Sequence, residues 1–271
     1  MIKSDAASSM LLTKSARESS NSLVSNSIYS GFHLGIRNFS KPHLGLRLGL
    51  LWAILDPLLR AAVFSFLMIV IRADTTPQSL VIGIFTITAL NNPFSSSMNL
   101  NLKDEPFPLS HTPTLPIIVS KITQDALMAI FLGVTSGIIL VIFASIPPEI
   151  VLSLPVGCAI LSFIGSGLGM LLAPLVTAIK DLSKLVSYVL LLGFFLQCVL
   201  FPYSVTTGLH RDVLYWMPHT IIVEWCRAVS SNTDTLFSLE HSFTVLFLWT
   251  VPALYGFARF KNYRWRATTW S

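Results

Sequence analysis

Residues 126–179 decide the fold, because they contain two long apolar runs joined by three residues: ALMAIFLGVTSGIILVIFASI (126–146), PPE (147–149) and IVLSLPVGCAILSFIGSGLGMLLAPLVTAI (150–179). Neither run contains a charged residue. A helix needs about 20 apolar residues to cross the hydrocarbon core of a bilayer. The Pro-Pro-Glu link is short enough to join two such helices as a hairpin. The stretch therefore predicts two adjacent membrane-crossing helices.

The composition of the whole chain agrees with this prediction. Of its 271 residues, 53% are hydrophobic and 11% are charged, and the mean hydropathy is +0.69. A soluble globular domain contains roughly 25% charged residues, so the composition argues against a water-soluble enzyme, a nucleic-acid-binding protein and a disordered chain. Cys158, Cys198 and Cys226 form no C-x-x-C pair and indicate neither a disulfide framework nor a zinc site. An all-α polytopic membrane protein is the class that remains.

Four further apolar runs flank the first two, at residues 48–71, 79–97, 185–201 and 243–258. Together they predict six transmembrane helices in a single domain that occupies residues 1–271. Residues 1–29 form a polar, Ser-rich tail without the apolar core of a signal peptide. Residues 30–46 mix apolar and basic side chains, which favours an amphipathic helix on the membrane surface. An ordinary basic flank that only sets topology is the alternative.

Lysine and arginine are distributed unevenly between the two sets of connections. One set holds most of the 18 basic residues: Lys3, Lys14, Arg17, Arg37, Lys41, Arg47, Lys103, Lys121, Lys180, Lys184, Arg259, Lys261, Arg264 and Arg266. The other set holds Arg72, Arg211 and Arg227. Because cytoplasmic loops are enriched in Lys and Arg, the distribution predicts an even number of spans with both termini in the cytoplasm.

Asp56 and Arg60 are charged residues within the first span, four positions apart and hence on one face of a helix. Charges in hydrocarbon are costly and usually pair and face protein. We expect an intramembrane charge pair that holds this helix in the bundle, where Pro57 is positioned to bend it. A charged face toward a substrate path or a partner helix is the alternative.

Two connections leave their roles open. Residues 94–124 are cytoplasmic by the charge distribution and are interrupted by Pro106, Pro108 and Pro113; they fit a docking surface for a soluble partner or a plain linker equally well. Ser204–His241 contains a stretch, 215–225, that is too apolar for a solvated loop and too short to cross twice. Short re-entrant or interfacial helices fit it, acting as a packing cap or as a gate over an exit.

The first-span motif LRLGLLWAILDP, Leu46–Pro57, resembles the signature of the permease subunits that export capsular polysaccharide, which belong to the ABC-2 type exporters. The similarity continues, in order and spacing over roughly residues 30–258, at Pro116–Ile118, Asp181–Val186, Cys198–Pro202, Pro218–Val229 and Ala253–Tyr255. Asp56 departs from the Glu of the closest capsule members. The loop before the third span departs too, since His111 is its only basic candidate between Pro108 and Pro116.

The resemblance implies an ABC-2 type fold and an inner-membrane permease that moves lipid-anchored polysaccharide from the cytoplasm to the periplasm of a bacterium. It implies a homodimer with the path between the copies, and two ATP-binding cassette subunits on the cytoplasmic face. It also implies a periplasmic copolymerase and an outer-membrane channel as further partners. No phosphate-binding G-x-x-x-x-G-K-[ST] motif occurs, so we expect no ATPase activity, catalytic residue, metal or cofactor in this chain, with ATP and Mg bound by the partner.

A sugar chain favours aromatic faces and hydrogen-bonding groups. The expected path residues are Trp52, Tyr188, Phe194, Phe195, Gln197, Tyr203 and Trp216, although aromatic residues in a span more often face lipid or the core. The residues expected to contact the ATPase are Arg37, Lys41, Lys103, Asp104, Glu105 and His111. Permeases for O-antigen or teichoic acid, a secondary transporter or channel, and a membrane-embedded glycan or lipid transferase are the alternative functions.

Overall fold

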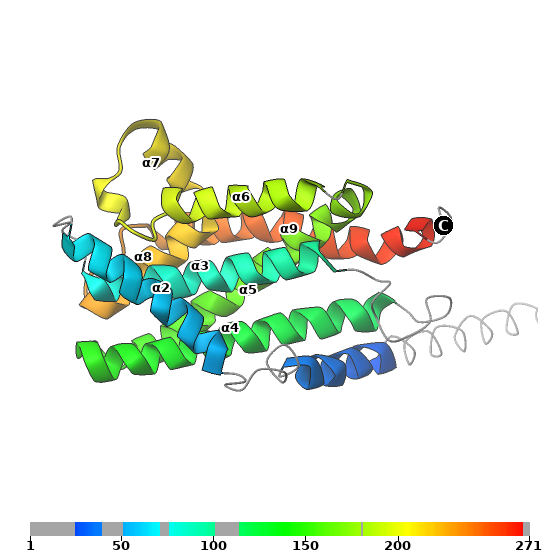
Figure 1. Ribbon diagram of the computed structural model, residues 1–271, viewed down its shortest axis with the longest axis horizontal. Helices are drawn as coiled ribbons and strands as arrows, with labels where there is room; N and C mark the ends of the chain where they lie inside the picture. The colour runs from blue at the N-terminus through cyan, green and yellow to red at the C-terminus, as the bar shows by residue number, and fades with distance from the viewer. Residues whose placement is uncertain (1–24, 40–50, 71–75, 101–113, 180, 268–271) are drawn as a thin grey trace, which may run out of the picture.

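The computed structural model describes residues 25–39, 51–70, 76–100, 114–179 and 181–267, and this part of the chain is helical, without a strand. Figure 1 shows long helices packed side by side, roughly along the length of the molecule, with α2 crossing the others at an angle. The all-α class is therefore confirmed for the described residues.

Each of the six apolar runs corresponds to one helix: α2 Leu51–Val70, α3 Pro77–Met98, α4 Thr114–Ala144, α5 Ile150–Ala178, α6 Asp181–Leu196 and α9 Leu239–Ala267. The boundaries differ most at α4, which begins at Thr114 rather than at residue 126. Pro116 lies in its first turn, where a missing backbone N–H breaks no helical hydrogen bond. The helix α6 differs in the opposite sense at its C-terminal end, since it ends at Leu196 rather than at residue 201. The predicted hairpin is present, since α4 ends at Ala144 and α5 begins at Ile150.

Three of these helices are long and apolar enough to cross a membrane: α4, α5 and the Leu239–Phe260 part of α9. Within the described residues α2, α3 and α6 do not meet the same requirement. With 16 residues α6 is shorter than the roughly 20 that a perpendicular crossing needs, and α3 carries Asn91 and Asn92 near its end. The chain is thus a helical protein with membrane-crossing character, and six spans stay a prediction.

The most buried of these helices is α5, which packs against α3, α4, α8 and α9. Small residues allow this close packing. On the α3 side, a Cβ atom built on Gly169 would lie 2.9 Å from Ser97 Cβ and 3.0 Å from Met98 N. On the α9 side, a Cβ atom on Gly167 would lie 2.6 Å from Ala253 Cα. Helices packed in an apolar environment use small residues in this way to bring their backbones together.

The predicted surface helix over 30–46 is shifted in the structure, where a helix covers residues 25–39. Residues 40–46 lie outside the described part of the chain. Gly31 and Gly35 of this helix pack on the first turns of α4, against Pro116 and Thr123. Ile28, Phe32 and Ile36 follow at helical spacing and are exposed. This apolar stripe supports the expected amphipathic character.

The segment between α6 and α9 contains two short helices, α7 Gly208–Tyr215 and α8 Pro218–Ser231, after a 3-10 turn at Tyr203–Val205. Figure 1 shows α7 projecting from one end of the bundle, here named the α7 end. The helix over 25–39 and the C-terminal part of α9 lie toward the opposite end (Figure 1). Most of α8 is buried in the bundle. The expected pair of short helices is present, and a role as a packing cap or as a gate over an exit stays a prediction.

We predict that Gly169→Ala destabilises the protein, because the added methyl group meets the backbone of α3 and overpacking of this kind costs about 1–3 kcal/mol. The measurement is the thermal unfolding midpoint of the purified protein in detergent. Gly193→Ala on α6 is the matched control, since the nearest atom to its added Cβ is Gln197 Nε2 at 3.5 Å. An unchanged midpoint for Gly169→Ala would contradict the packing described here.

Candidate functional site

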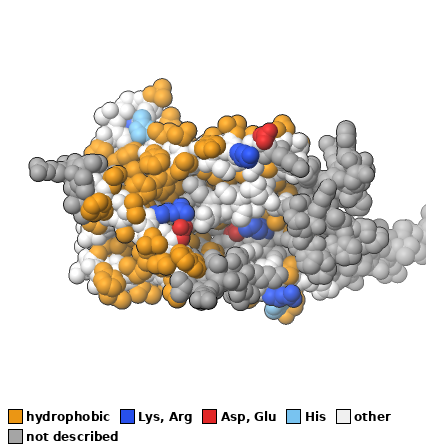
Figure 2. Space-filling view, in the orientation of Figure 1, with side chains coloured by type: hydrophobic (Ala, Val, Ile, Leu, Met, Phe, Trp, Pro, Cys, Tyr) orange, Lys and Arg blue, Asp and Glu red, His pale blue; other side chains and the backbone are white. Residues whose placement is uncertain are grey.

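The helices α2 and α6 expose a large apolar surface, here named the α2–α6 surface. Figure 2 shows that hydrophobic side chains make up most of the visible surface in the region of α2. No side chain of α6 is buried. The exposed large apolar residues of the two helices are Leu51, Trp52, Leu59, Val63, Phe66, Leu67, Leu185, Tyr188, Val189, Leu191, Leu192, Phe195 and Leu196.

The predicted charge pair lies on this surface. Arg60 Nη2 is 2.7 Å from Asp56 Oδ2, and the two side chains are 55% and 52% exposed. Pro57 lies inside α2, which continues through it. The pair therefore forms as expected, but the single chain does not bury it in the bundle. An ion pair that is half exposed within an apolar surface lacks the surroundings that intramembrane charges normally have.

Four of the seven expected path residues belong to the α2–α6 surface or border it. Trp52, Tyr188 and Phe195 are exposed, and Phe194 is half-buried. Phe64 of α2 connects the two helices, with ring centroids 5.1 Å from Phe194 and 6.1 Å from Phe195. The structure thus brings the aromatic residues of α6 next to the helix that carries the charge pair.

The other three path residues lie elsewhere. Tyr203 is buried and packs on Phe237, with ring centroids 4.9 Å apart. Gln197 is half-buried, and its Oε1 atom is enclosed without a hydrogen-bond partner among the described residues. Trp216 is exposed at the α7 end, where its carbonyl accepts a hydrogen bond from Trp249 Nε1 at 2.7 Å. Tyr203 is therefore a core residue in the single chain.

Of the residues expected to contact an ATPase, Arg37 is exposed on the helix over 25–39. The remaining five, Lys41, Lys103, Asp104, Glu105 and His111, lie outside the described residues. Arg37 comes directly after Ile36, the last residue of the apolar stripe of this helix. Because its side chain is exposed, it is available for a contact at the end of the molecule opposite to α7.

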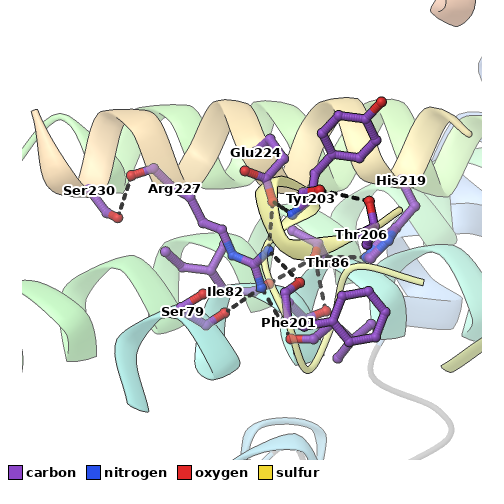
Figure 3. Close-up of polar contacts among 12 residues, drawn as sticks. Ser79, Ile82, Thr86, Phe201, Tyr203, Thr206, His219, Glu224, Arg227 and Ser230 are labelled. Carbon is purple, nitrogen blue, oxygen red and sulfur yellow. Dashed lines mark hydrogen bonds and ion pairs between the residues drawn. The ribbon is translucent and has the colours of Figure 1, made fainter. Parts of the chain in front are cut away.

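A second polar arrangement, the Arg227 network, is buried at the α7 end (Figure 3). Arg227 Nη1 donates to Glu224 Oε1 at 2.8 Å and to the Phe201 carbonyl at 3.2 Å. Nη2 donates to the carbonyls of Val199 at 3.1 Å and Ser79 at 3.3 Å. The Tyr203 backbone N–H donates to Glu224 Oε1 at 3.1 Å. One side chain of α8 therefore fastens the start of α3 and the segment that follows α6.

His219, just over two helical turns before Arg227 on α8, is buried with it. Its Nε2 atom lies 3.2 Å from Thr86 Oγ1, and that hydroxyl donates to the Ile82 carbonyl at 2.8 Å. His219 and Thr86 therefore share a buried side-chain hydrogen bond, in which the tautomer of the imidazole sets the donor. Burial, together with the nearby Arg227 charge, lowers the pKa of His219 to about 3. The imidazole is therefore neutral at physiological pH and acts as a packing and hydrogen-bonding group.

A third arrangement lies in the middle of the bundle. Lys121 and Asp125 of α4 form a buried ion pair, with side chains 10% and 9% exposed. Lys121 Nζ donates to Ser96 Oγ at 2.8 Å, and Ser166 Oγ of α5 donates to Asp125 Oδ2 at 2.7 Å. Ser97 Oγ of α3 lies 3.5 Å from the same oxygen.

The distribution of basic residues places Lys121 and Arg227 in connections between spans. This prediction is wrong for both residues, because their side chains are buried against neighbouring helices.

These buried pairs are the polar residues that the sequence reasoning missed. Their signal was the helical spacing of opposite charges, Lys121 with Asp125 at i,i+4 and Glu224 with Arg227 at i,i+3. Spacing alone does not predict whether a pair is buried, because burial depends on the neighbouring helices. Among the residues that the structure describes, no group of three or more His, Cys, Asp or Glu side chains is placed to hold a metal ion.

We predict that Arg227→Met strongly destabilises the protein. The change removes the donors to three carbonyls and leaves the Glu224 carboxylate buried without its partner, a loss of about 3–5 kcal/mol. The readout is the fraction of monodisperse protein that survives a heating series in detergent. Arg259→Met is the matched control, since Arg259 is exposed on α9. Similar survival of the two variants would show that the network contributes little.

Comparison with known proteins does not assign this chain to a family. No family model matches the chain, and no curated protein matches its sequence. The resemblance of Leu46–Pro57 to the capsule permeases is therefore a similarity of motifs.

Proposed function

We propose that this chain is the permease subunit of an ATP-driven exporter of the ABC-2 type, and that it moves lipid-anchored capsular polysaccharide across the bacterial inner membrane. The observation that carries the proposal is the half-exposed Asp56–Arg60 pair on the apolar α2–α6 surface. Asp56 lies within the LRLGLLWAILDP motif, which resembles the signature of this family, and Arg60 follows three residues after the motif ends.

A second copy of the chain is the covering that the pair requires. An exposed ion pair in contact with lipid tails costs several kcal/mol, whereas a protein partner or a hydrated path satisfies its hydrogen-bonding groups. The apolar residues around it, such as Val63 and Phe66, are suited to helix–helix contact. A homodimer formed through this surface would place the pairs of both copies beside a common central path.

The same surface offers groups that suit a sugar chain. Aromatic faces pack on the C–H faces of sugars, and Trp52, Tyr188 and Phe195 are exposed there. The charge pair supplies hydrogen-bond donors and acceptors close by. Such a path binds a repeating polar polymer weakly and at many points, as translocation requires.

Energy for export would come from two ATP-binding cassette subunits, which bind ATP and Mg. The helix over 25–39 supports this part of the proposal, because it is held to the start of α4 and exposes Arg37. A push on this helix would be transmitted to α4 through Gly31 and Gly35. In the proposed arrangement both termini lie in the cytoplasm, and the periplasmic copolymerase and outer-membrane channel act downstream.

A second candidate function is a secondary transporter, and the buried Lys121–Asp125 pair favours it. Paired acids and bases between membrane helices serve as proton-transfer sites in such proteins. The two candidates differ in their energy source. Transport in inside-out vesicles that requires ATP supports the exporter, and transport driven by a proton gradient without ATP supports the secondary transporter. A permease for O-antigen or teichoic acid differs from the first candidate only in its glycan.

Deletion of the gene for this chain tests the proposal. We expect capsular polysaccharide to disappear from the cell surface and its lipid-linked form to accumulate in the cytoplasm. Complementation with Asp56→Asn should restore less than about a tenth of surface polysaccharide, because Arg60 is left as an unpaired charge whose burial costs more than 1.4 kcal/mol. Extraction and chemical analysis of the glycan from both compartments provide the measurement.

The double variant Asp56→Arg/Arg60→Asp is the control, because it keeps an ion pair at the same two positions. It should recover export relative to Asp56→Asn, with equal protein levels on immunoblots. Normal surface polysaccharide in the deletion strain would overturn the proposed function. Full export by Asp56→Asn would remove the charge pair from it.

Cross-linking tests the homodimer. Val63→Cys should form a disulfide-linked dimer when membranes are oxidised, since Val63 lies on the α2–α6 surface and is 65% exposed. Phe247→Cys on α9, where Phe247 is 71% exposed, is the matched control and should stay monomeric. The native cysteines, Cys158, Cys198 and Cys226, are buried and do not interfere. Equal cross-linking at both positions would mean random collision rather than an interface.

A further inference from the structure

A hollow of about 550 Å³ opens at the α7 end, between the first turn of α3, the α4–α5 hairpin and the C-terminal part of α8. It is separate from the α2–α6 surface, since no residue of α2 or of α6 lines it. Its volume lies within the range of small-molecule sites, about 300–1,000 Å³. The cavity is here named the outer pocket.

The outer pocket is graded from a buried floor to an exposed rim. Glu224 and Arg227 are buried at its floor. Gln78, Ser79 and Ser230 are half-buried and form its walls. The rim is exposed and consists mainly of hydroxyl side chains and one carboxylate: Thr76, Ser145, Ser204, Ser231, Thr233 and Asp234.

The charge of the floor disfavours an anion. All four Nη hydrogens of Arg227 are used within the protein, by Glu224 and by three backbone carbonyls. Its Nε atom is enclosed and has no partner among the described residues, so solvent does not reach it. The guanidinium therefore offers no donor to a phosphate, sulfate or carboxylate ligand. The Asp234 carboxylate and the second carboxylate oxygen of Glu224 are negatively charged hydrogen-bond acceptors, which repel an anion.

Uncommitted hydrogen-bonding groups surround this floor. In the described part of the chain the side chains of Gln78, Ser145, Ser204 and Ser231 have no hydrogen-bond partner, and Glu224 Oε2 has none either. A hydroxyl can both donate and accept, an amide offers both roles, and a carboxylate only accepts. Pro202, Ile146 and Leu236 add apolar patches between these groups.

We propose that the outer pocket is a binding site for a neutral sugar residue. A sugar presents hydroxyl groups that can pair with the hydroxyl, amide and carboxylate groups of the lining, and its C–H face can pack on Pro202, Ile146 and Leu236. Glu224 Oε2 is the strongest acceptor on the floor, because hydrogen bonds to a charged oxygen are about twice as strong as neutral ones. The site does not depend on the proposed export function, since it involves neither the α2–α6 surface nor an ATPase.

The test uses cysteine reactivity in purified protein. Ser231→Cys places a reactive thiol at the rim, and its rate of modification by a maleimide reports whether the pocket is occupied. Leu209→Cys is the control, because Leu209 is 80% exposed on α7 and does not line the pocket. The probes are glucose, galactose, N-acetylglucosamine and maltose, with sodium phosphate as the anionic comparison.

We expect at least one of these sugars, at about 100 mM, to slow modification of Ser231→Cys by about tenfold, as a dissociation constant of about 10 mM requires. Leu209→Cys should react at an unchanged rate, and phosphate should protect neither. Adding Gln78→Leu to Ser231→Cys should abolish the protection while the thermal unfolding midpoint stays unchanged.

Three results would overturn the assignment. Absence of protection by all four sugars would show that the pocket is not a sugar site. Equal protection by phosphate would show an anion site, and equal slowing of Leu209→Cys would show a non-specific effect of the solute. None of these results bears on export, which the gene deletion tests separately.

Discussion

A charged side chain is stable inside an apolar bundle only when a partner and hydrogen bonds compensate its lost hydration. The described residues contain three ion pairs, and each meets this constraint differently. Glu224–Arg227 and Lys121–Asp125 are nearly buried. Arg227 donates hydrogen bonds to backbone carbonyls of neighbouring segments, and Asp125 accepts one from the Ser166 hydroxyl of α5. Asp56–Arg60 has its partner but is half exposed. The two buried pairs therefore hold the bundle together, and the third is the place where the proposed second copy would supply the missing surroundings.

The small residues of α5 make the buried pairs possible. Gly165 and Gly169 bring α5 close to α3, and Ser166, which lies between them in sequence, reaches Asp125 of α4. Larger residues at these positions would separate the helices and open the Asp125 site to lipid or water. Close packing and polar satisfaction thus depend on the same short stretch, IGSGLGM at residues 164–170.

The helices themselves were predictable, because apolar runs and the Pro147-Pro148 hairpin report local preferences of the chain. Burial was not, because it depends on contacts between distant segments. Lys121 and Arg227 look like loop charges in sequence, yet α4 begins twelve positions before its apolar run and α8 folds back onto α3. The burial of Tyr203 was hidden for a similar reason, since the Glu224 carboxylate accepts a hydrogen bond from its backbone N–H and Phe237 packs on its ring. The half exposure of Asp56 was not predictable either, since the sequence favoured a pair that holds its helix in the bundle.

The distribution of buried contacts also suggests which parts of the molecule can move at low cost. Polar bonds between side chains and to backbone carbonyls join α3, α4, α5 and α8 into one unit. The helix α6 has no buried side chain, and α2 is held mainly by Ala61 and Phe64 against α3 and α6. A displacement of α2 and α6 therefore breaks apolar contacts that lipid or a partner can replace, whereas a displacement within the unit exposes charges. In the proposed exporter, the path would open by movement of α2 and α6 relative to that unit.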